Sequence, residues 1–128
     1  ILLSTGTFPN KLKFVESAKV LHNLGYRLYA TNGTGEFLKS YNIPIKILNW
    51  PLTNKTPNVI DYIKNKKIDL VINIPKNYYD KEITNDYLIR RTAIDFNIQL
   101  ITNIQLANKF VEAISLVKEF EIKSWDEY

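Results

Sequence analysis

Short apolar runs alternate with longer amphipathic stretches along the whole chain. Each run is only a few residues long and is followed by polar or turn-forming residues, which is typical of buried strands. The predicted strands are residues 1–4, 27–30, 45–48, 70–73 and 99–101. Helical patterns fill the gaps, and strands that alternate with helices indicate parallel βαβ units. The pattern therefore predicts an α/β fold with a parallel sheet.

The amphipathic stretches predict helices at about residues 10–24, 34–41, 59–64, 85–96 and 104–117. Their apolar positions recur at spacings of three and four, which places them on one face of a helix. The first helix should stop at Gly25, and Asn97 suits a left-handed cap after the fourth. We expect the last helix to cover one face of the sheet with a row of apolar residues: Ala107, Phe110, Val111, Ile114 and Val117.

The composition fits one soluble domain over residues 1–128, with 45% hydrophobic and 23% charged residues. No apolar run approaches the roughly 18–20 residues that span a bilayer, and no signal-peptide pattern opens the chain. The lack of cysteine excludes disulfides and fits a reducing, cytoplasmic compartment. Because the chain starts within a predicted strand and contains no methionine, we expect it to be a piece of a longer polypeptide.

The net charge of +4 comes from basic residues spread along the chain, with one cluster at Lys64, Lys66 and Lys67. This cluster follows a predicted helix, where cations complement the helix dipole. We interpret it as a solvated helix end, and we predict neither a nucleic-acid partner nor a membrane partner.

One turn, YATNGT at residues 29–34, ends a predicted strand and opens a helix. The first N–H groups of a helix have no partner within the helix, and the helix dipole places partial positive charge there. Gly33 lets the backbone approach a ligand closely. With the hydroxyls of Thr31 and Thr34, this turn is suited to a phosphate or a carboxylate, although such hydroxyls can also serve only as helix caps.

Other polar residues follow the remaining predicted strands, at the edge where open parallel sheets bind ligands. Lys11 can supply a positive charge beside the threonines, or can be a solvated lysine. Trp50 can cover a ligand, or can be half-buried packing. Asn73 and Lys76 follow the fourth strand, where the amide of Asn73 can also serve only to join two loops. His22 has no carboxylate or other ligand at helical spacing, which favours a surface role.

The sequence contains no set of residues for nucleophilic catalysis, no P-loop and no cluster of metal ligands. The carboxylates that could act as bases are scattered over predicted helices and one exposed loop. The polar edge therefore indicates a binding site without a catalytic centre and without a metal.

Several segments of this chain resemble a single family. They are HNLGY at residues 22–26, YATNGT at 29–34, Trp50-Pro51, DLVINIP at 69–75, YLIRRTAID at 87–95 and LITN at 100–103. Together they resemble the carboxyl-terminal regulatory domain of the large subunit of carbamoyl-phosphate synthetase, over nearly the whole chain. The segments at 69–75 and 87–95 are specific to that family, whereas the threonine turn is shared with its fold relatives.

The resemblance implies the methylglyoxal synthase-like fold, a three-layer Rossmann-type sandwich around a five-stranded parallel sheet. It implies a non-catalytic allosteric module that regulates a synthetase body. That body makes carbamoyl phosphate from bicarbonate, ATP and glutamine or ammonia, for arginine and pyrimidine biosynthesis. ATP and metal ions would belong to the body, and the domain would hold no cofactor. The implied partners are the synthetase domains of the same chain and, in a glutamine-dependent enzyme, a glutaminase subunit.

By the family's motifs, Lys11, Thr31 and Thr34 match anion-binding positions, and Trp50 and Asn73 match further effector positions. The resemblance therefore implies that these residues bind an anionic effector, either a nucleotide or an acylated amino acid.

Which effector binds stays open, because the chain departs from both groups of relatives. The pyrimidine-inhibited bacterial enzymes carry a lysine where this chain has Trp50, and a threonine pair in place of Ile74-Pro75. The acetylglutamate-activated animal synthetases share the Trp-Pro and Asn-x-Pro features, but they have asparagines where this chain has Lys76 and Asp86. Neither UMP nor acetylglutamate can be assigned.

The alternative is an enzyme of the same fold, methylglyoxal synthase, which eliminates phosphate from dihydroxyacetone phosphate. That chemistry needs one carboxylate in the loop after the third strand and another after the fourth. Residues 49–58 and 74–79 contain neither Asp nor Glu, so we favour the non-catalytic interpretation. A purine-biosynthetic cyclohydrolase domain is disfavoured because its basic loop has no counterpart in residues 49–58.

Overall fold

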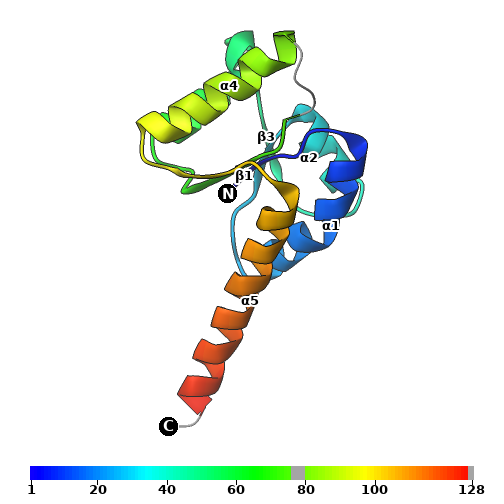
Figure 1. Cartoon of the computed structure of the whole chain (residues 1–128), viewed down its shortest axis with the longest axis vertical. Coiled ribbons are helices and arrows are strands. Elements are labelled where there is room, and N and C mark those ends of the chain that lie inside the picture. Colours follow the sequence, from blue (N-terminus) through cyan, green and yellow to red (C-terminus); the bar gives the residue numbers. More distant parts are fainter. Residues whose placement is uncertain (76–79, 127–128) are drawn as a thin grey trace.

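A computed structural model describes the backbone of residues 1–75 and 80–126 and the side chains of residues 1–75 and 85–119. Its centre is a five-stranded sheet in the order β3-β2-β1-β4-β5, in which every pair of neighbours is parallel. The sheet confirms all the predicted strands, with small shifts of their ends (Figure 1). The strands are β1 (Leu2–Ser4), β2 (Tyr29–Thr31), β3 (Lys46–Leu48), β4 (Leu70–Asn73) and β5 (Gln99–Ile101).

The sheet separates two hydrophobic cores. Leu3 pairs with Ile72 and Ile72 with Ile101, and all three are buried in the core on one face. Leu2 pairs with Val71, and both belong to the core on the other face. Side chains alternate along a strand, so residues in register across the sheet share a face. Burial of both faces explains why the strand sequences are almost continuously apolar.

Helices cover both faces of the sheet and make three layers (Figure 1). The first face carries α1 (Phe8–Asn23), α2 (Asn32–Lys39) and α5 (Ile104–Asp126). The second carries α3 (Val59–Lys64) and α4 (Asp80–Asp95). A short 3-10 helix, η1 (Pro51–Thr53), follows β3 and was not predicted. The arrangement confirms the predicted fold class, a parallel α/β sandwich.

Two helices are longer than the apolar periodicity predicts. α4 begins at Asp80 rather than at residue 85, and α5 continues to Asp126 rather than ending at 117. The added turns carry no apolar stripe, so periodicity does not predict them. They are rich in charged residues, several of which are good helix formers. The turn residues behave as predicted, since Gly25 has φ +93° and Asn97 has φ +58°. None of the described helices is long and apolar enough to cross a membrane.

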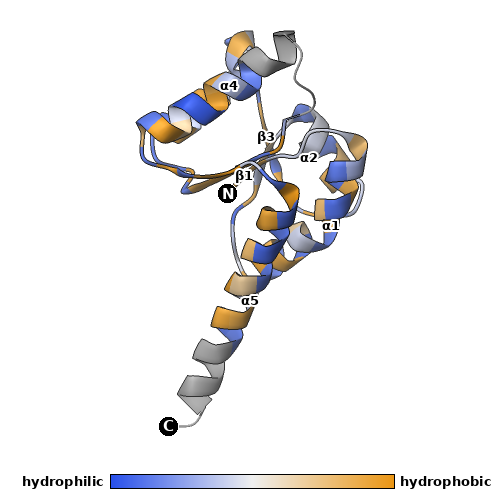
Figure 2. Ribbon diagram, in the orientation of Figure 1, coloured by the Kyte–Doolittle hydropathy of each residue, from blue (hydrophilic) through white to orange (hydrophobic). Residues whose placement is uncertain are grey.

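The expectation that the whole apolar row of α5 covers the sheet is wrong in part. Ala107 and Val111 are buried, but Phe110 is 36% exposed and Val117 is 57% exposed. Figures 1 and 2 show that α5 extends past the other elements and carries apolar positions with it. Periodicity tells which residues share a face of a helix, but burial also requires a neighbouring layer, which the later turns of α5 lack within the described residues.

Candidate anion-binding site

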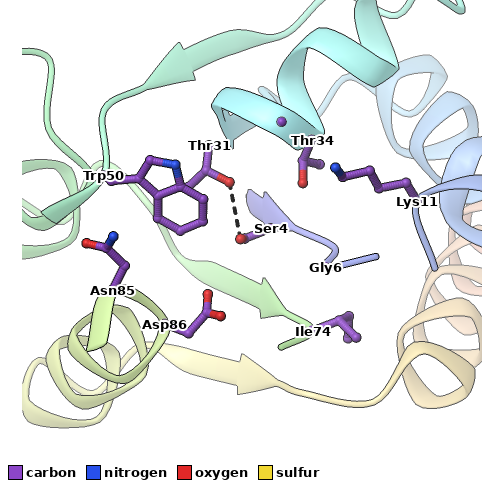
Figure 3. A pocket seen from close by; sticks show the side chains of 10 residues that line it. Ser4, Gly6, Lys11, Thr31, Thr34, Trp50, Ile74, Asn85 and Asp86 are labelled. Carbon is purple, nitrogen blue, oxygen red and sulfur yellow. Dashed lines mark hydrogen bonds between the residues drawn. The ribbon is translucent and has the colours of Figure 1, made fainter. Parts of the chain in front are cut away.

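The ends of β1, β2 and β4 open onto one cavity of about 240 Å³. It lies at the carboxyl edge of the sheet, beside the place where the strand order reverses, which is the usual ligand site of open parallel sheets. Side chains reach it from both helical layers and from the loop after β3 (Figure 3). The lining residues are Ser4, Gly6, Lys11, Thr31, Gly33, Thr34, Trp50, Ile74, Asn85 and Asp86.

The turn from β2 into α2 supplies two buried threonine hydroxyls. Thr31 stands at the N-cap of α2, and its Oγ1 donates to Ser4 Oγ at 3.1 Å instead of capping the helix. Thr34 Oγ1 accepts the backbone N–H of Thr5 at 3.0 Å, which leaves its own proton for donation. Neither hydroxyl caps α2, so neither occupies the position that an anion would take at the start of this helix. The helix dipole favours negative charge at that position.

Lys11 brings a positive charge to the same turn. A Cβ added at Gly33 would lie 3.1 Å from Lys11 Nζ, so the ammonium group lies directly over this glycine. A Cβ at this position would require the flexible end of the Lys11 side chain to move by a few tenths of an ångström, so glycine leaves the most room for Lys11 here. Figure 3 shows the side chain of Lys11 extending toward Thr34. The structure therefore brings together Lys11, Thr31, Gly33 and Thr34, the set that the sequence suggested.

Gly6 lets the loop after β1 close against the loop after β4. Its φ of +64° lies in the left-handed region, which other residues adopt at a cost. A Cβ at this position would lie only 2.6 Å from the backbone oxygen of Ile74 and 3.0 Å from that of Pro75. Since both obstacles are backbone atoms, only glycine fits where these two loops form one wall of the cavity.

Trp50 lies between the cavity and the core on the second face. It lines the cavity, is half-buried, and packs against the cluster that contains Leu2 and Leu48. Its backbone oxygen accepts from Asn58 Nδ2 at 3.0 Å and from Thr53 Oγ1 at 2.9 Å. These bonds hold the loop after β3 in place, so the indole ring contributes both to packing and to the cavity wall.

Asn73 lies behind the cavity rather than in its lining. It is 0% exposed, and its Nδ2 donates to Asp86 Oδ1 at 3.0 Å while its Oδ1 accepts from Arg90 Nη1 at 3.1 Å. Both ends of the amide are thus used to join β4 to α4. Asn73 is therefore positioned to orient Asp86, and its direct contact with a ligand stays a prediction. Lys76, the other candidate after β4, lies outside the described residues.

The sequence did not single out several lining residues. Asp86 was noted only as a departure from the animal synthetases, and Asn85 was expected to be the first residue of a helix that in fact begins at Asp80. Leu52 N donates to Asn85 Oδ1 at 3.1 Å, so α4 also supports the loop that carries Trp50. A helical position that faces a distant loop leaves no local signal in the sequence. For Ser4, the sequence does carry a signal, because its position at the end of β1 places it at the same edge of the sheet as the cavity.

Among the described residues, no group of three or more His, Cys, Asp or Glu is placed to hold a metal ion. His22 is exposed in the last turn of α1 and is not among the lining residues of the cavity. Among its described lining residues, the cavity offers one ammonium group, hydroxyls, the start of α2, an indole ring, the amide of Asn85 and one carboxylate.

Comparison with known proteins places the chain in a family. The MGS-like domain family matches residues 13–102. The chain is 41% identical over 123 residues to multifunctional protein pyr1-3 of Dictyostelium discoideum, covering 92% of this chain and 6% of that protein. It is 38% identical over 122 residues to the carbamoyl phosphate synthase large chain of Clostridium botulinum, covering 95% of this chain and 11% of that protein.

A third relative is the mitochondrial carbamoyl-phosphate synthase (ammonia) of Homo sapiens. It is 36% identical over 120 residues, which cover 91% of this chain and 8% of that protein. The chain thus spans between 6% and 11% of the length of these relatives. The chain therefore belongs to the MGS-like domain family, and its resemblance to the MGS-like domain of the carbamoyl-phosphate synthetases is confirmed.

Proposed function

We propose that this chain is the effector-binding regulatory domain of a carbamoyl-phosphate synthetase, and that its cavity holds an anionic metabolite. One observation carries the proposal: Lys11, two buried threonine hydroxyls and the start of α2 converge on one cavity. An ammonium group, hydroxyl donors and a helix dipole each stabilise negative charge, and they act together on a partly desolvated ligand.

The cavity is placed to connect the two helical layers. A ligand held by Thr34 and Lys11 on one side would lie beside Asn85 and Asp86 of α4 on the other. A ligand that favours one arrangement of these layers shifts the population toward it. We infer that this shift changes the surface presented to the synthetase domains of the same chain, which would carry the ATP and metal sites and contact any glutaminase subunit. A cytoplasmic location remains a prediction.

Phosphate or sulfate at millimolar concentration should raise the melting temperature of the chain. A ligand at about 100 times its Kd adds roughly 2.7 kcal/mol to the free energy of unfolding. Thr34→Val removes a hydroxyl donor, and Thr31→Val removes the hydroxyl that holds Ser4 Oγ in place. The loss of a hydrogen bond to a charged group costs about 1.5 kcal/mol, or about tenfold in Kd. We therefore expect a smaller shift in both variants, measured by thermal unfolding against anion concentration.

Thr102→Val is the matched control, because Thr102 is exposed after β5 at the same edge of the sheet. An equal response in wild type and all three variants would show that the anion binds elsewhere. Regulation is tested in the longer synthetase, where carbamoyl phosphate formation should respond to an anion that the domain binds, and should respond less in Thr34→Val. A bound anion without any effect on that rate would refute regulation.

We also expect the chain to form no methylglyoxal from dihydroxyacetone phosphate above the uncatalysed rate. Asp86 is the one carboxylate among the lining residues that the structure describes, and Asn73 donates to it. The elimination needs carboxylates at two loops, and neither residues 49–58 nor 74–79 contain one. The measurement is a colorimetric assay of methylglyoxal over time. Turnover of even about 1 s⁻¹, within the usual range for enzymes, would refute the non-catalytic interpretation.

A further inference from the structure

We propose that a groove between β5 and the outer flank of α5, residues Leu106, Phe110 and Ile114, is the surface by which this domain docks on the synthetase domains of the same longer polypeptide. The occupant is an apolar surface of those domains, which completes the helical layer over β4 and β5. This inference rests on the proposed function only in taking the chain as one domain of a longer synthetase, and it does not involve the anion site.

The outer flank is defined by the sequence of α5. Leu106, Phe110 and Ile114 follow one another at spacings of four, so they lie on one side of the helix. Another side is bound to α1, because Ser17 Oγ donates to Asn108 Oδ1 at 2.6 Å. The outer flank points away from α1 and lines the groove together with residues of β5.

The groove has a volume of about 520 Å³ and lies over an uncovered part of the sheet. Leu70 and Gln99 pair across β4 and β5 and both line it, so its floor is the first face of the sheet. Within the described part of the chain, α5 is the outermost helix on this face, because α1 lies between it and α2. Parallel sheets are normally covered by helices on both faces, and this part of β5 lacks that cover.

The apolar side chains of α5 at the groove are exposed to solvent in the domain alone. Leu106 is 56% exposed and Phe110 is 36% exposed, and Val117, which continues the row, is 57% exposed. Figure 2 shows apolar positions along α5 where the helix extends past the other elements. Asp69 and Gln99 also line the groove and are exposed. Apolar residues bordered by polar ones are typical of a protein–protein interface.

The lengths of the matches to relatives favour the rest of a synthetase as the occupant. This chain spans between 6% and 11% of the relatives' length, so about nine-tenths of each relative lies outside it. The match to the general MGS-like family ends at residue 102, before α5 begins. The match to the Clostridium botulinum large chain covers 95% of this chain and so extends far into α5. The helix that forms the groove is thus shared with a synthetase beyond the part that matches the general family, which favours the synthetase domains over a second copy of this domain.

The test compares hydrogen exchange of α5 in the 128-residue chain and in the longer synthetase that contains it. In the synthetase, we expect the backbone amides of residues 106–114 to exchange at least about tenfold more slowly, because the docked surface must open before they exchange. The added protection should not depend on protein concentration, since both partners belong to one polypeptide. The measurement is hydrogen–deuterium exchange followed by mass spectrometry, at two protein concentrations.

Leu106→Gln places a polar group in the groove, and Leu116→Gln is the matched control. Both leucines belong to α5 and have similar exposed fractions, 56% and 59%, but Leu116 lines the side of α5 that faces α1. In the 128-residue chain, both variants should leave the urea midpoint nearly unchanged, because both positions are at the surface. In the synthetase, Leu106→Gln should reduce the added protection by about tenfold, whereas Leu116→Gln should leave it unchanged.

Three results would overturn the docking surface. The first is equal exchange of α5 in the chain and in the synthetase, which needs no variant. The second is an equal effect of the two leucine variants on the added protection. The third is protection that rises with protein concentration, which would assign the groove to a second copy. The proposed function fails separately: a protected α5 in a synthetase whose rate does not respond to a bound anion would keep the docking surface and refute regulation.

Discussion

Replacing Gly6 with alanine should lower the free energy of unfolding by roughly 2–5 kcal/mol. The left-handed backbone at φ +64° costs about 1–2 kcal/mol for any residue with a Cβ. The new methyl carbon would also lie 2.6 Å from the backbone oxygen of Ile74, and overpacking of this kind typically adds about 1–3 kcal/mol. The total free energy of unfolding of a domain of this size is about 5–15 kcal/mol, so the loss would be a large fraction of the stability.

Gly25→Ala separates the two causes. Gly25 has φ +93°, and within the described part of the chain a Cβ there would have no heavy atom within 4 Å. This variant should lose only the backbone cost of about 1–2 kcal/mol. Urea unfolding of both variants beside wild type measures the difference. Equal losses at the two positions would mean that the loops after β1 and β4 can separate easily, and that Gly6 does not fix the wall of the cavity.

The sheet and both cores could be predicted because they depend on local patterns. A parallel strand buried on both faces is a short apolar run, and each helix carries its apolar row at a spacing of three or four. The register then follows, since Leu3, Ile72 and Ile101 must share one face. The pattern does not show which neighbouring element, if any, buries the apolar row of each helix. Phe110 has the right spacing for burial and is nevertheless 36% exposed.

The candidate site divides in the same way. Thr31, Gly33 and Thr34 lie within four residues of one turn, so their convergence could be inferred from the sequence alone. Asp86 reaches the cavity from α4, on the opposite face of the sheet, and only the packed structure shows that it lies there. Asn73 ends a strand at the correct edge, but both ends of its amide bond to α4, a contact that no sequence spacing indicates.

There is a physical reason why the effector could not be assigned from the sequence. The departures from both groups of relatives change charge, and the effect of a charge depends on where it points. The structure places one of these positions, Asp86, inside the cavity, while Lys76 lies outside the described residues. The resemblance alone therefore does not assign the effector, because the charge at these positions differs from that of both groups of relatives.

Trp50→Ala should weaken the binding of ribose 5-phosphate, a small probe whose sugar extends beyond its phosphate group, by roughly 10- to 30-fold while leaving the chain folded. Truncating a buried aromatic residue in a binding site costs about 2 kcal/mol of affinity, which is about 30-fold. Full burial of a tryptophan in a core is worth about 3–5 kcal/mol of stability, but Trp50 is only half-buried, so about 2 kcal/mol should be lost. The backbone oxygen of Trp50 keeps its bonds to Asn58 and Thr53 in the variant, so the loop should hold its shape.

The binding of inorganic phosphate provides an internal check, because phosphate at the start of α2 is too small to need the indole ring. Its affinity should change less than about twofold. Leu52→Ala is the matched control: Leu52 is an apolar residue of the same loop and is 55% exposed, so its loss should affect neither stability nor binding. Urea unfolding and calorimetric titration of both variants decide the matter. A stability loss near 4 kcal/mol, as expected of a core tryptophan, with an unchanged affinity for ribose 5-phosphate would assign Trp50 to core packing and remove it from the ligand site.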